Sequence, residues 1–163
     1  MNDLLSLVLT GVGATLLMDL WGLARNRLFG LPLPDYGMVG RWIGHMAHGK
    51  FHHDRIAAAP PISAERVIGW SIHYIIGVVF AAGLVSIVGF EWLQRPTLGP
   101  ALAFGLATVV APFFLMQPGM GAGIAASRTP KPGSARLQSL ITHAVFGFGL
   151  WTAAYVTHYL GRH

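Results

Sequence analysis

The stretch that decides the fold is residues 67–90, VIGWSIHYIIGVVFAAGLVSIVGF, an apolar run that contains no Asp, Glu, Lys or Arg. A helix needs about 20 apolar residues to cross the hydrocarbon core of a bilayer. Three further runs meet this length: Leu4–Ala24, Leu98 to about Met116, and Leu137–Leu160. The sequence therefore predicts an all-α integral membrane four-helix bundle. It forms one domain over residues 1–163, with helices at about 4–28, 66–91, 98–117 and 136–160.

The composition agrees with a membrane protein and excludes several other classes. Hydrophobic residues make up 53% of the 163 residues and charged residues only 10%, whereas soluble domains carry about 25% charged residues. Cysteine is absent, which excludes disulfides, thiolate metal sites and iron–sulfur clusters. The net charge is +5, but the 11 Lys and Arg residues lie mostly in two loops between the apolar runs. This distribution indicates the lipid bilayer as partner and argues against nucleic acid.

The basic residues also predict an orientation. With four spans, the loops at residues 30–66 and 119–136 share one side of the membrane, and the two termini share the other. Two basic residues, Arg95 and Arg162, lie on the side of the termini. Nine flank the loops: Arg25, Arg27, Arg41, Lys50, Arg55, Arg66, Arg128, Lys131 and Arg136. By the positive-inside rule both large loops are cytoplasmic and both termini lie outside. We expect a short interfacial helix near Val39–Ala47 in the long loop between the first two helices.

Two of the spans share a spacing of charged, polar and small residues. Each begins with an Arg, followed after seven residues by a His and after four more by a Gly: Arg66, His73 and Gly77, and Arg136, His143 and Gly147. The other two spans share an Ala-Thr pair, at residues 14–15 and 107–108. Small residues at four-residue spacing are typical of close helix packing in membranes. The pattern predicts two duplicated helical hairpins, with the second and fourth spans touching through Gly69, Gly77 and Gly147.

Three ionisable residues lie within the predicted spans. Asp19 is about nine residues, or roughly 13 Å, from the cytoplasmic end of its span, and His73 and His143 are each roughly 10 Å deep. Ionisable side chains are costly inside a bilayer, so they default to a functional hypothesis. Two imidazoles and a carboxylate suit a divalent transition metal. Alternatively, His73 and His143 hold haem b, or the three residues form a buried Asp–His hydrogen-bond network that only stabilises the bundle.

A histidine-rich run in the long loop could complete such a metal site. His45, His48, His52 and His53 lie within nine residues of one another, followed by Asp54. Clusters of this kind bind divalent metals readily, although solvated loop histidines give the same pattern. The sequence leaves both readings open for the four histidines.

The depth of the polar residues bears on the function. Asp19, His73 and His143 lie in the inner half of their spans, and the outer halves are apolar apart from Thr and Ser. A conduction path needs polar residues through the whole depth, so we expect a site open to the cytoplasm. The preferred hypothesis is a membrane-embedded site that binds a transition metal, with redox chemistry as one use. A small transporter or channel for an ion or small solute, a haem protein and a structural membrane protein are the alternatives.

Four segments resemble one family of membrane proteins. They are Met18–Trp21 (MDLW), Val39–Met46 (VGRWIGHM), Gly69–Tyr74 (GWSIHY) and Met116–Pro130 (MQPGMGAGIAASRTP). The sequence is similar to domain of unknown function 2938, a bacterial family of small four-helix membrane proteins. The resemblance implies a multi-pass protein of the bacterial inner membrane with four helices, and it implies no activity or site residue. In that membrane, the termini that the positive-inside rule puts outside would be periplasmic. So small a bundle buries little of its own surface, and we expect a homodimer.

Overall fold

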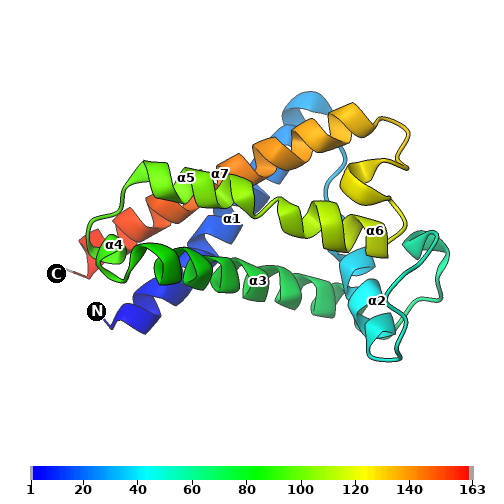
Figure 1. Cartoon of the computed structure of the whole chain (residues 1–163), viewed down its shortest axis with the longest axis horizontal. Helices are drawn as coiled ribbons and strands as arrows, with labels where there is room; N and C mark the ends of the chain where they lie inside the picture. Colours follow the sequence, from blue (N-terminus) through cyan, green and yellow to red (C-terminus); the bar gives the residue numbers. More distant parts are fainter. Residues whose placement is uncertain (1, 162–163) are drawn as a thin grey trace. The chain divides into compact units, whose positions relative to one another are not determined.

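The structure, a computed structural model, describes residues 2–161 and consists of helices joined by turns and loops. Arg162, one of the two basic residues counted on the side of the termini, lies outside the described residues. No strand occurs within residues 2–161. In chain order the elements are α1 (Asp3–Phe29), α2 (Tyr36–Met46), η1 (Ile56–Ala58), α3 (Glu65–Val88), α4 (Glu91–Gln94), α5 (Leu98–Ala107), η2 (Pro112–Met116), α6 (Gln117–Gly119), η3 (Ile124–Ala126) and α7 (Pro132–Leu160) (Figure 1).

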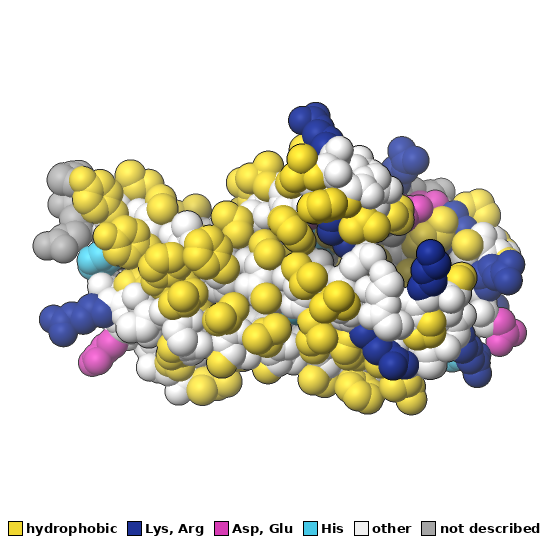
Figure 2. Space-filling view, turned by 90° about the horizontal axis from the view of Figure 1, so that it is seen from above, with side chains coloured by type: hydrophobic (Ala, Val, Ile, Leu, Met, Phe, Trp, Pro, Cys, Tyr) yellow, Lys and Arg dark blue, Asp and Glu magenta, His cyan; other side chains and the backbone are white. Residues whose placement is uncertain are grey.

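Four helical stretches are long and apolar enough to cross a membrane, as the hydropathy predicts. They are α1, α3, the stretch Leu98–Gly119, and α7. Large apolar side chains stay exposed along them, including Leu16, Val79 and Ile87. Figure 2 shows apolar side chains over much of the visible surface. Such a surface is unfavourable in water and favourable against lipid chains.

The ends of the helices follow from local chemistry. The side chain of Asn2 accepts a hydrogen bond from the Leu4 amide at 3.0 Å and caps the start of α1. Gly30, with a φ of 64°, ends α1, and its N–H bonds the Asn26 carbonyl. At the other end of the chain, α7 begins four residues before the predicted Arg136. Pro132 explains this early start, because proline at the first helical position needs no hydrogen-bond partner for its nitrogen.

The third span differs from the continuous helix predicted over 98–117. α5 ends at Ala107, a turn follows, and the chain continues as a π-helix over Pro112–Met116 before α6. Pro112 has no N–H and its ring crowds the carbonyl four residues earlier, which belongs to Thr108. The Thr108 hydroxyl in turn donates to the Gly105 carbonyl at 2.6 Å. Prolines and this local hydrogen bond therefore break a span that hydropathy alone presents as uniform.

The chain divides into two compact units, and α3, α7 and the third span each contribute to both. The first unit comprises residues 1–33, 74–108 and 141–163, and the second comprises residues 34–73 and 109–140. The first unit thus contains α1, α4, α5 and most of α3 and α7. The second contains α2, η1, η2, α6, η3 and the beginnings of α3 and α7.

Glycines bring pairs of helices together in the first unit. A Cβ added to Gly11 in α1 would lie 2.6 Å from the Cα of Val78 in α3. A Cβ added to Gly147 in α7 would lie 2.7 Å from the Ala101 carbonyl oxygen in α5. Real Cβ atoms do not approach so closely, so neither helix pair has room for a side chain at these positions. The buried core beside them includes the side chains of Ala14, Leu84 and Leu150.

The predicted contact of the second and fourth spans through glycines is wrong. Gly77 packs against Thr15 and Gly11 of α1, while Gly147 packs against α5. Gly69 packs within the second unit, against Tyr36 of α2. A small residue permits close approach to any neighbouring helix, so its spacing cannot name the partner. α3 and α7 meet instead through Phe80 and Phe146, whose ring centroids are 6.0 Å apart.

The two helix pairs nevertheless repeat one arrangement. In α1 the Thr15 hydroxyl donates to the Gly11 carbonyl at 2.8 Å, and at the end of α5 Thr108 donates to Gly105 at 2.6 Å. Each of these glycines then contacts the second helix of its pair, α3 or α7. The threonines are the two that the Ala-Thr pairs single out in the sequence. The α1–α3 and α5–α7 pairs therefore share the contacts that two duplicated hairpins would have.

The glycine contact yields the first prediction. We expect Gly77→Val to lower the free energy of unfolding by about 2 kcal/mol, within the range of roughly 1–3 kcal/mol typical of overpacking. The new side chain would collide with Thr15. Thermal unfolding in detergent measures the effect. Gly99→Val is the matched control, because nothing lies within 4 Å of a Cβ there; equal melting temperatures for the two variants would contradict the close approach of α1 and α3.

Candidate functional site

The ionisable residues of the predicted spans each have their own partners. Asp19 of α1 accepts a hydrogen bond from the Tyr74 hydroxyl of α3 at 3.0 Å. His143 of α7 is bonded through Nδ1 to the Thr108 hydroxyl oxygen at 2.8 Å. Because Thr108 gives its only proton to the Gly105 carbonyl, its oxygen must accept from His143. In the neutral ring of His143, Nδ1 therefore carries the proton and Nε2 is an acceptor.

His73 lies in an aromatic setting in the second unit. Its ring stacks on Tyr36, with centroids 4.0 Å apart and planes 26° apart. The edge of Trp70 lies on it as well, at a centroid distance of 5.9 Å. Within residues 2–161 no group of three or more His, Cys, Asp or Glu side chains is arranged to hold a metal ion. The predicted metal centre at Asp19, His73 and His143 therefore gains no support from the structure.

The second unit is organised by Arg41 of α2, which is 8% exposed. Its Nε and Nη2 each donate to a carboxylate oxygen of Glu65 at 2.8 Å, a bidentate pair. The remaining Nη1 donates to the carbonyls of Ala57 and Ala59, at 3.4 and 3.1 Å. The hydrogen bond to Glu65 raises the pKa of Arg41 further above its usual value. One guanidinium thus joins α2, the loop around η1 and the first residue of α3.

Trp42, the neighbour of Arg41, fixes the other side of the loop. Its indole N–H donates to the Phe51 carbonyl at 2.9 Å. The indole also packs against Gly119 of α6, where an added Cβ would lie 2.6 Å from the ring. The Gly119 carbonyl accepts from the His53 amide at 2.9 Å, and the Met120 carbonyl accepts from the Ile56 amide at 3.1 Å. The loop backbone is therefore tied both to α2 and to the segment around α6.

These ties bury His53 without giving its ring a hydrogen bond. The residue is 4% exposed, and neither ring nitrogen has a partner among the described residues. Its closest ring contact is the edge of His45, with centroids 5.0 Å apart. A buried polar group without a partner costs free energy, so such groups are rare. Among the described residues of this unit, His53 leaves both ring nitrogens, and Gln117 its side-chain oxygen, without a hydrogen-bond partner.

The other loop histidines are placed differently. His45 bonds the Pro60 carbonyl through Nε2 at 2.9 Å, and His48, in the turn after α2, bonds the Gly44 carbonyl of α2 through Nδ1 at 3.1 Å. His52 is exposed. Of the four, the structure brings His45 and His53 into ring contact and leaves His48 exposed in the turn. They do not form one four-residue cluster.

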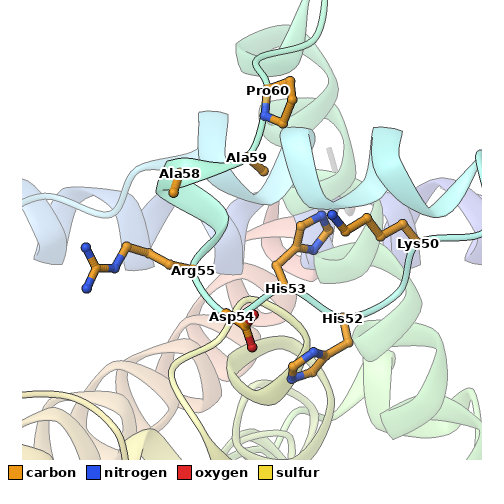
Figure 3. Close-up of a pocket in the computed structure, with 8 residues that line it drawn as sticks. All are labelled: Lys50, His52, His53, Asp54, Arg55, Ala58, Ala59 and Pro60. Atoms are coloured by element: carbon orange, nitrogen blue, oxygen red, sulfur yellow. The ribbon is translucent and has the colours of Figure 1, made fainter.

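His53 opens into a pocket, here called the head pocket. Its volume is about 320 Å³ and it is lined by Lys50, His52, His53, Asp54, Arg55, Ala58, Ala59 and Pro60. Figure 3 shows the Lys50 amine and the His53 ring directed toward each other, while the Arg55 side chain extends away. The pocket thus presents an ammonium group and an unpartnered imidazole side by side.

Comparison with known proteins agrees with the resemblance found in the sequence. A family model described as protein of unknown function (DUF2938) matches residues 8–157. The chain belongs to this family. Searches of curated proteins and of solved structures found no match to the chain. The matched region includes every residue of the head pocket, and the family description gives no activity for the pocket.

The electrostatics of the head pocket in this DUF2938 protein are positive at His53. Burial lowers the pKa of His53, and the electrostatic influence of Lys50, and then of His45 and His52, lowers it further, while the Gly119 backbone acts in the opposite direction. The lining residues carry two fixed positive charges and one carboxylate. A positive potential beside a neutral imidazole favours an anion and opposes a divalent cation.

Sequence reasoning missed the cations of this pocket. Lys50 and Arg55 entered the prediction only as charges that set the orientation of the loops. Arg41 and Glu65 are 24 residues apart, and no local pattern pairs them. The available signal was the run from Lys50 to Arg55, in which basic residues outnumber the single acid, Asp54. That balance favours anion binding over metal binding.

The bidentate pair yields the second prediction. We expect Arg41→Lys to speed amide exchange in residues 50–59 about tenfold, since an ammonium cannot hold Glu65 and both loop carbonyls in the same fork. Hydrogen exchange read by mass spectrometry measures the loop directly. Arg66→Lys, an exposed neighbour, is the matched control. Unchanged exchange in the Arg41 variant would show that the loop is held without the guanidinium.

The buried imidazole yields the third prediction. We expect the protein to lose stability as the pH falls below 6.5, the ordinary pKa of the ring. Folding lowers the pKa of His53, so in acid the unfolded chain binds a proton that the folded chain does not, and unfolding is favoured. Melting temperatures from about pH 7.5 to about pH 5 measure the slope.

A pair of variants isolates the contribution of His53 to this slope. His53→Phe keeps a ring in the buried position and removes the titration, so its melting temperature should fall less with acid than that of the parent chain. His48→Phe, at an exposed position, should keep the parental slope. An unchanged slope in the His53 variant would contradict the assignment.

Proposed function

We propose that this protein is a membrane protein that binds a small anionic solute, of the carboxylate or phosphate class, in the head pocket. The observation that carries the proposal is His53, which is buried, whose ring makes no hydrogen bond among the described residues, and which is directed toward Lys50. Binding would satisfy both groups. The ammonium would pair with the anion, and the neutral imidazole would donate one N–H to it.

The size of the pocket supports a small solute. A volume of about 320 Å³ lies at the lower end of the range for small-molecule sites, roughly 300–1,000 Å³. Ala58, Ala59 and Pro60 supply the apolar wall and Lys50, His52 and His53 the polar one. A molecule with a charged head and a short apolar body would contact both walls.

The same observations favour an anion over the transition metal that the sequence suggested. The charge of Lys50 acts on His53, and Nε2 of His45 is already bonded to Pro60. No three-residue ligand group occurs within residues 2–161. Metal binding by His45 and His53 becomes an outcome of the test, and the transporter, haem and structural hypotheses stay predictions of the sequence.

The setting of the pocket is also part of the proposal. The family and the four apolar helical stretches support a membrane protein. The pocket lies in the loop between α2 and α3, outside these stretches, where its charged groups can meet water. From the positive-inside rule we place this loop on the cytoplasmic side of a bacterial inner membrane.

Binding to the protein in lipid nanodiscs tests the proposal. We expect isothermal titration with inorganic phosphate or succinate to show saturable binding, which weakens about tenfold or more in Lys50→Gln, since a hydrogen bond to a charged group is lost. Lys131→Gln removes an exposed cation from another loop and is the matched control. Binding should also weaken with rising salt, because part of it is electrostatic.

Two outcomes would overturn the proposal. One is the absence of binding by both anions to a folded protein. The other is tight binding of Zn²⁺ that His45→Ala and His53→Ala abolish while Lys50→Gln leaves it intact, which would restore the metal hypothesis at these two residues. Equal weakening in Lys50→Gln and Lys131→Gln would show a diffuse charge effect instead of a site.

A further inference from the structure

A second pocket lies in the first unit, where α4 and the turn to α5 meet the last turns of α7. We call it the tyrosine pocket. Its volume is about 340 Å³ and it is lined by Gln94, Arg95, Pro96, Thr97, Tyr155, His158 and Tyr159. It shares no residue with the head pocket, and the inference below is independent of the proposed function.

The turn that carries Arg95 is fixed by its neighbours. The Arg95 amide donates to the Glu91 carbonyl at 3.1 Å and ends α4. The indole N–H of Trp92, a residue 6% exposed, donates to the Thr97 carbonyl at 3.2 Å. Arg95 itself is exposed. Its backbone is therefore held from both sides, while its guanidinium can reach a ligand.

A hydrogen-bond chain connects this turn to α7 and sets the proton on His158. The Gln94 side-chain amide donates to the Asp3 carboxylate at 3.3 Å. A carboxylate accepts only, so the other end of the Gln94 amide, its oxygen, faces His158 at 3.2 Å. Nδ1 of His158 must then be the donor. The three residues join the beginning of α1, the end of α4 and the end of α7.

The place of the pocket along the helices indicates its surroundings. α3 ends at Val88, the third candidate span begins with α5 at Leu98, and α7 ends at Leu160. The pocket therefore lies beside one terminus of each of these three candidate spans. Tyr155 and Tyr159 are 58% and 61% exposed. Tyrosines gather at the level of the lipid head groups because the ring prefers the apolar side and the hydroxyl the wet side.

We propose that the tyrosine pocket binds the head group of an anionic phospholipid. Arg95 would pair with the phosphate through its planar fork. Tyr155 and Tyr159 line the same pocket, and no Asp or Glu is among its lining residues in the described part of the chain. The exposed side chains of Val156 and Leu160 on α7 would meet the acyl chains. The proposed occupant is therefore a lipid of the leaflet on the side of the chain termini.

Two features of the pocket favour a lipid over a free phosphate ion. Among the described residues that line it, Arg95 is the only Lys or Arg, and an exposed ion pair contributes little by itself. Exposed apolar side chains, Val156 and Leu160, also neighbour the pocket residues of α7 in the sequence. A lipid gains from both, since its chains contribute burial that the single ion pair cannot.

Native mass spectrometry of the full chain with added lipids tests the proposal. We expect phosphatidylglycerol to stay bound at several times the level of phosphatidylcholine, and this excess to fall about tenfold in Arg95→Gln, which removes charge-assisted hydrogen bonds. Arg27→Gln, an exposed arginine at the end of α1, is the matched control. Arg95→Lys should keep part of the excess, because the charge remains and the fork is lost.

Three results would overturn this assignment. They are equal retention of the two lipids, an Arg95→Gln variant that melts like the parent chain and keeps the excess, and displacement of the lipid by millimolar inorganic phosphate. The last would identify a free-anion site. Failure here would leave the head pocket untouched, since Lys50→Gln reports only on that pocket.

Discussion

The second unit depends on one interaction, the fork that Arg41 makes with Glu65. A guanidinium that is nearly buried must be paired and fully hydrogen-bonded, or it destabilises the fold. Here the carboxylate takes two of its donors and the loop carbonyls of Ala57 and Ala59 share another. The loop that lines the head pocket has little regular structure, but Arg41 holds it in place. The guanidinium cannot move without losing its hydrogen bonds to Glu65 and to the loop carbonyls together.

The first unit depends on close packing at glycines instead of on charge. For this unit the sequence predicted the helices and the small residues, but not which helices those residues contact. Hydropathy predicts the spans because it is a property of the chain alone, and four helical stretches long and apolar enough to cross a membrane are found. The small residues were also identified correctly. Their partners were not, since Gly77 packs on α1 and Gly147 on α5. A stripe of small residues predicts that another helix packs closely against it. Only the three-dimensional arrangement shows which helix that is.

The candidate metal residues show why depth is not enough to predict a site. Asp19 and His73 were expected at similar depth, but successive helical residues point about 100° apart. Tyr74, next to His73, is the residue of α3 that bonds Asp19, while the His73 ring stacks on Tyr36. At the position beside Asp19, α3 therefore presents the phenol of Tyr74 and not the imidazole of His73, the preceding residue. Rotation of each helix about its own axis decides the chemistry, and neither composition nor hydropathy reports it.

The loop histidines show a second limit. Solvation, metal binding and anion binding all suit a run of histidines between charged residues, so the pattern alone cannot separate them. Two facts of the structure support the proposed anion site: His53 is buried with no ring hydrogen bond among the described residues, and its ring is directed toward Lys50. The cost of burying that ring is offset by hydrogen bonds around it, from its own amide to the Gly119 carbonyl and from the Trp42 indole N–H to the Phe51 carbonyl. A fold that holds a buried imidazole near an ammonium in this way would present a preorganised place for the proposed anion, and preorganisation would favour selective binding in so small a pocket.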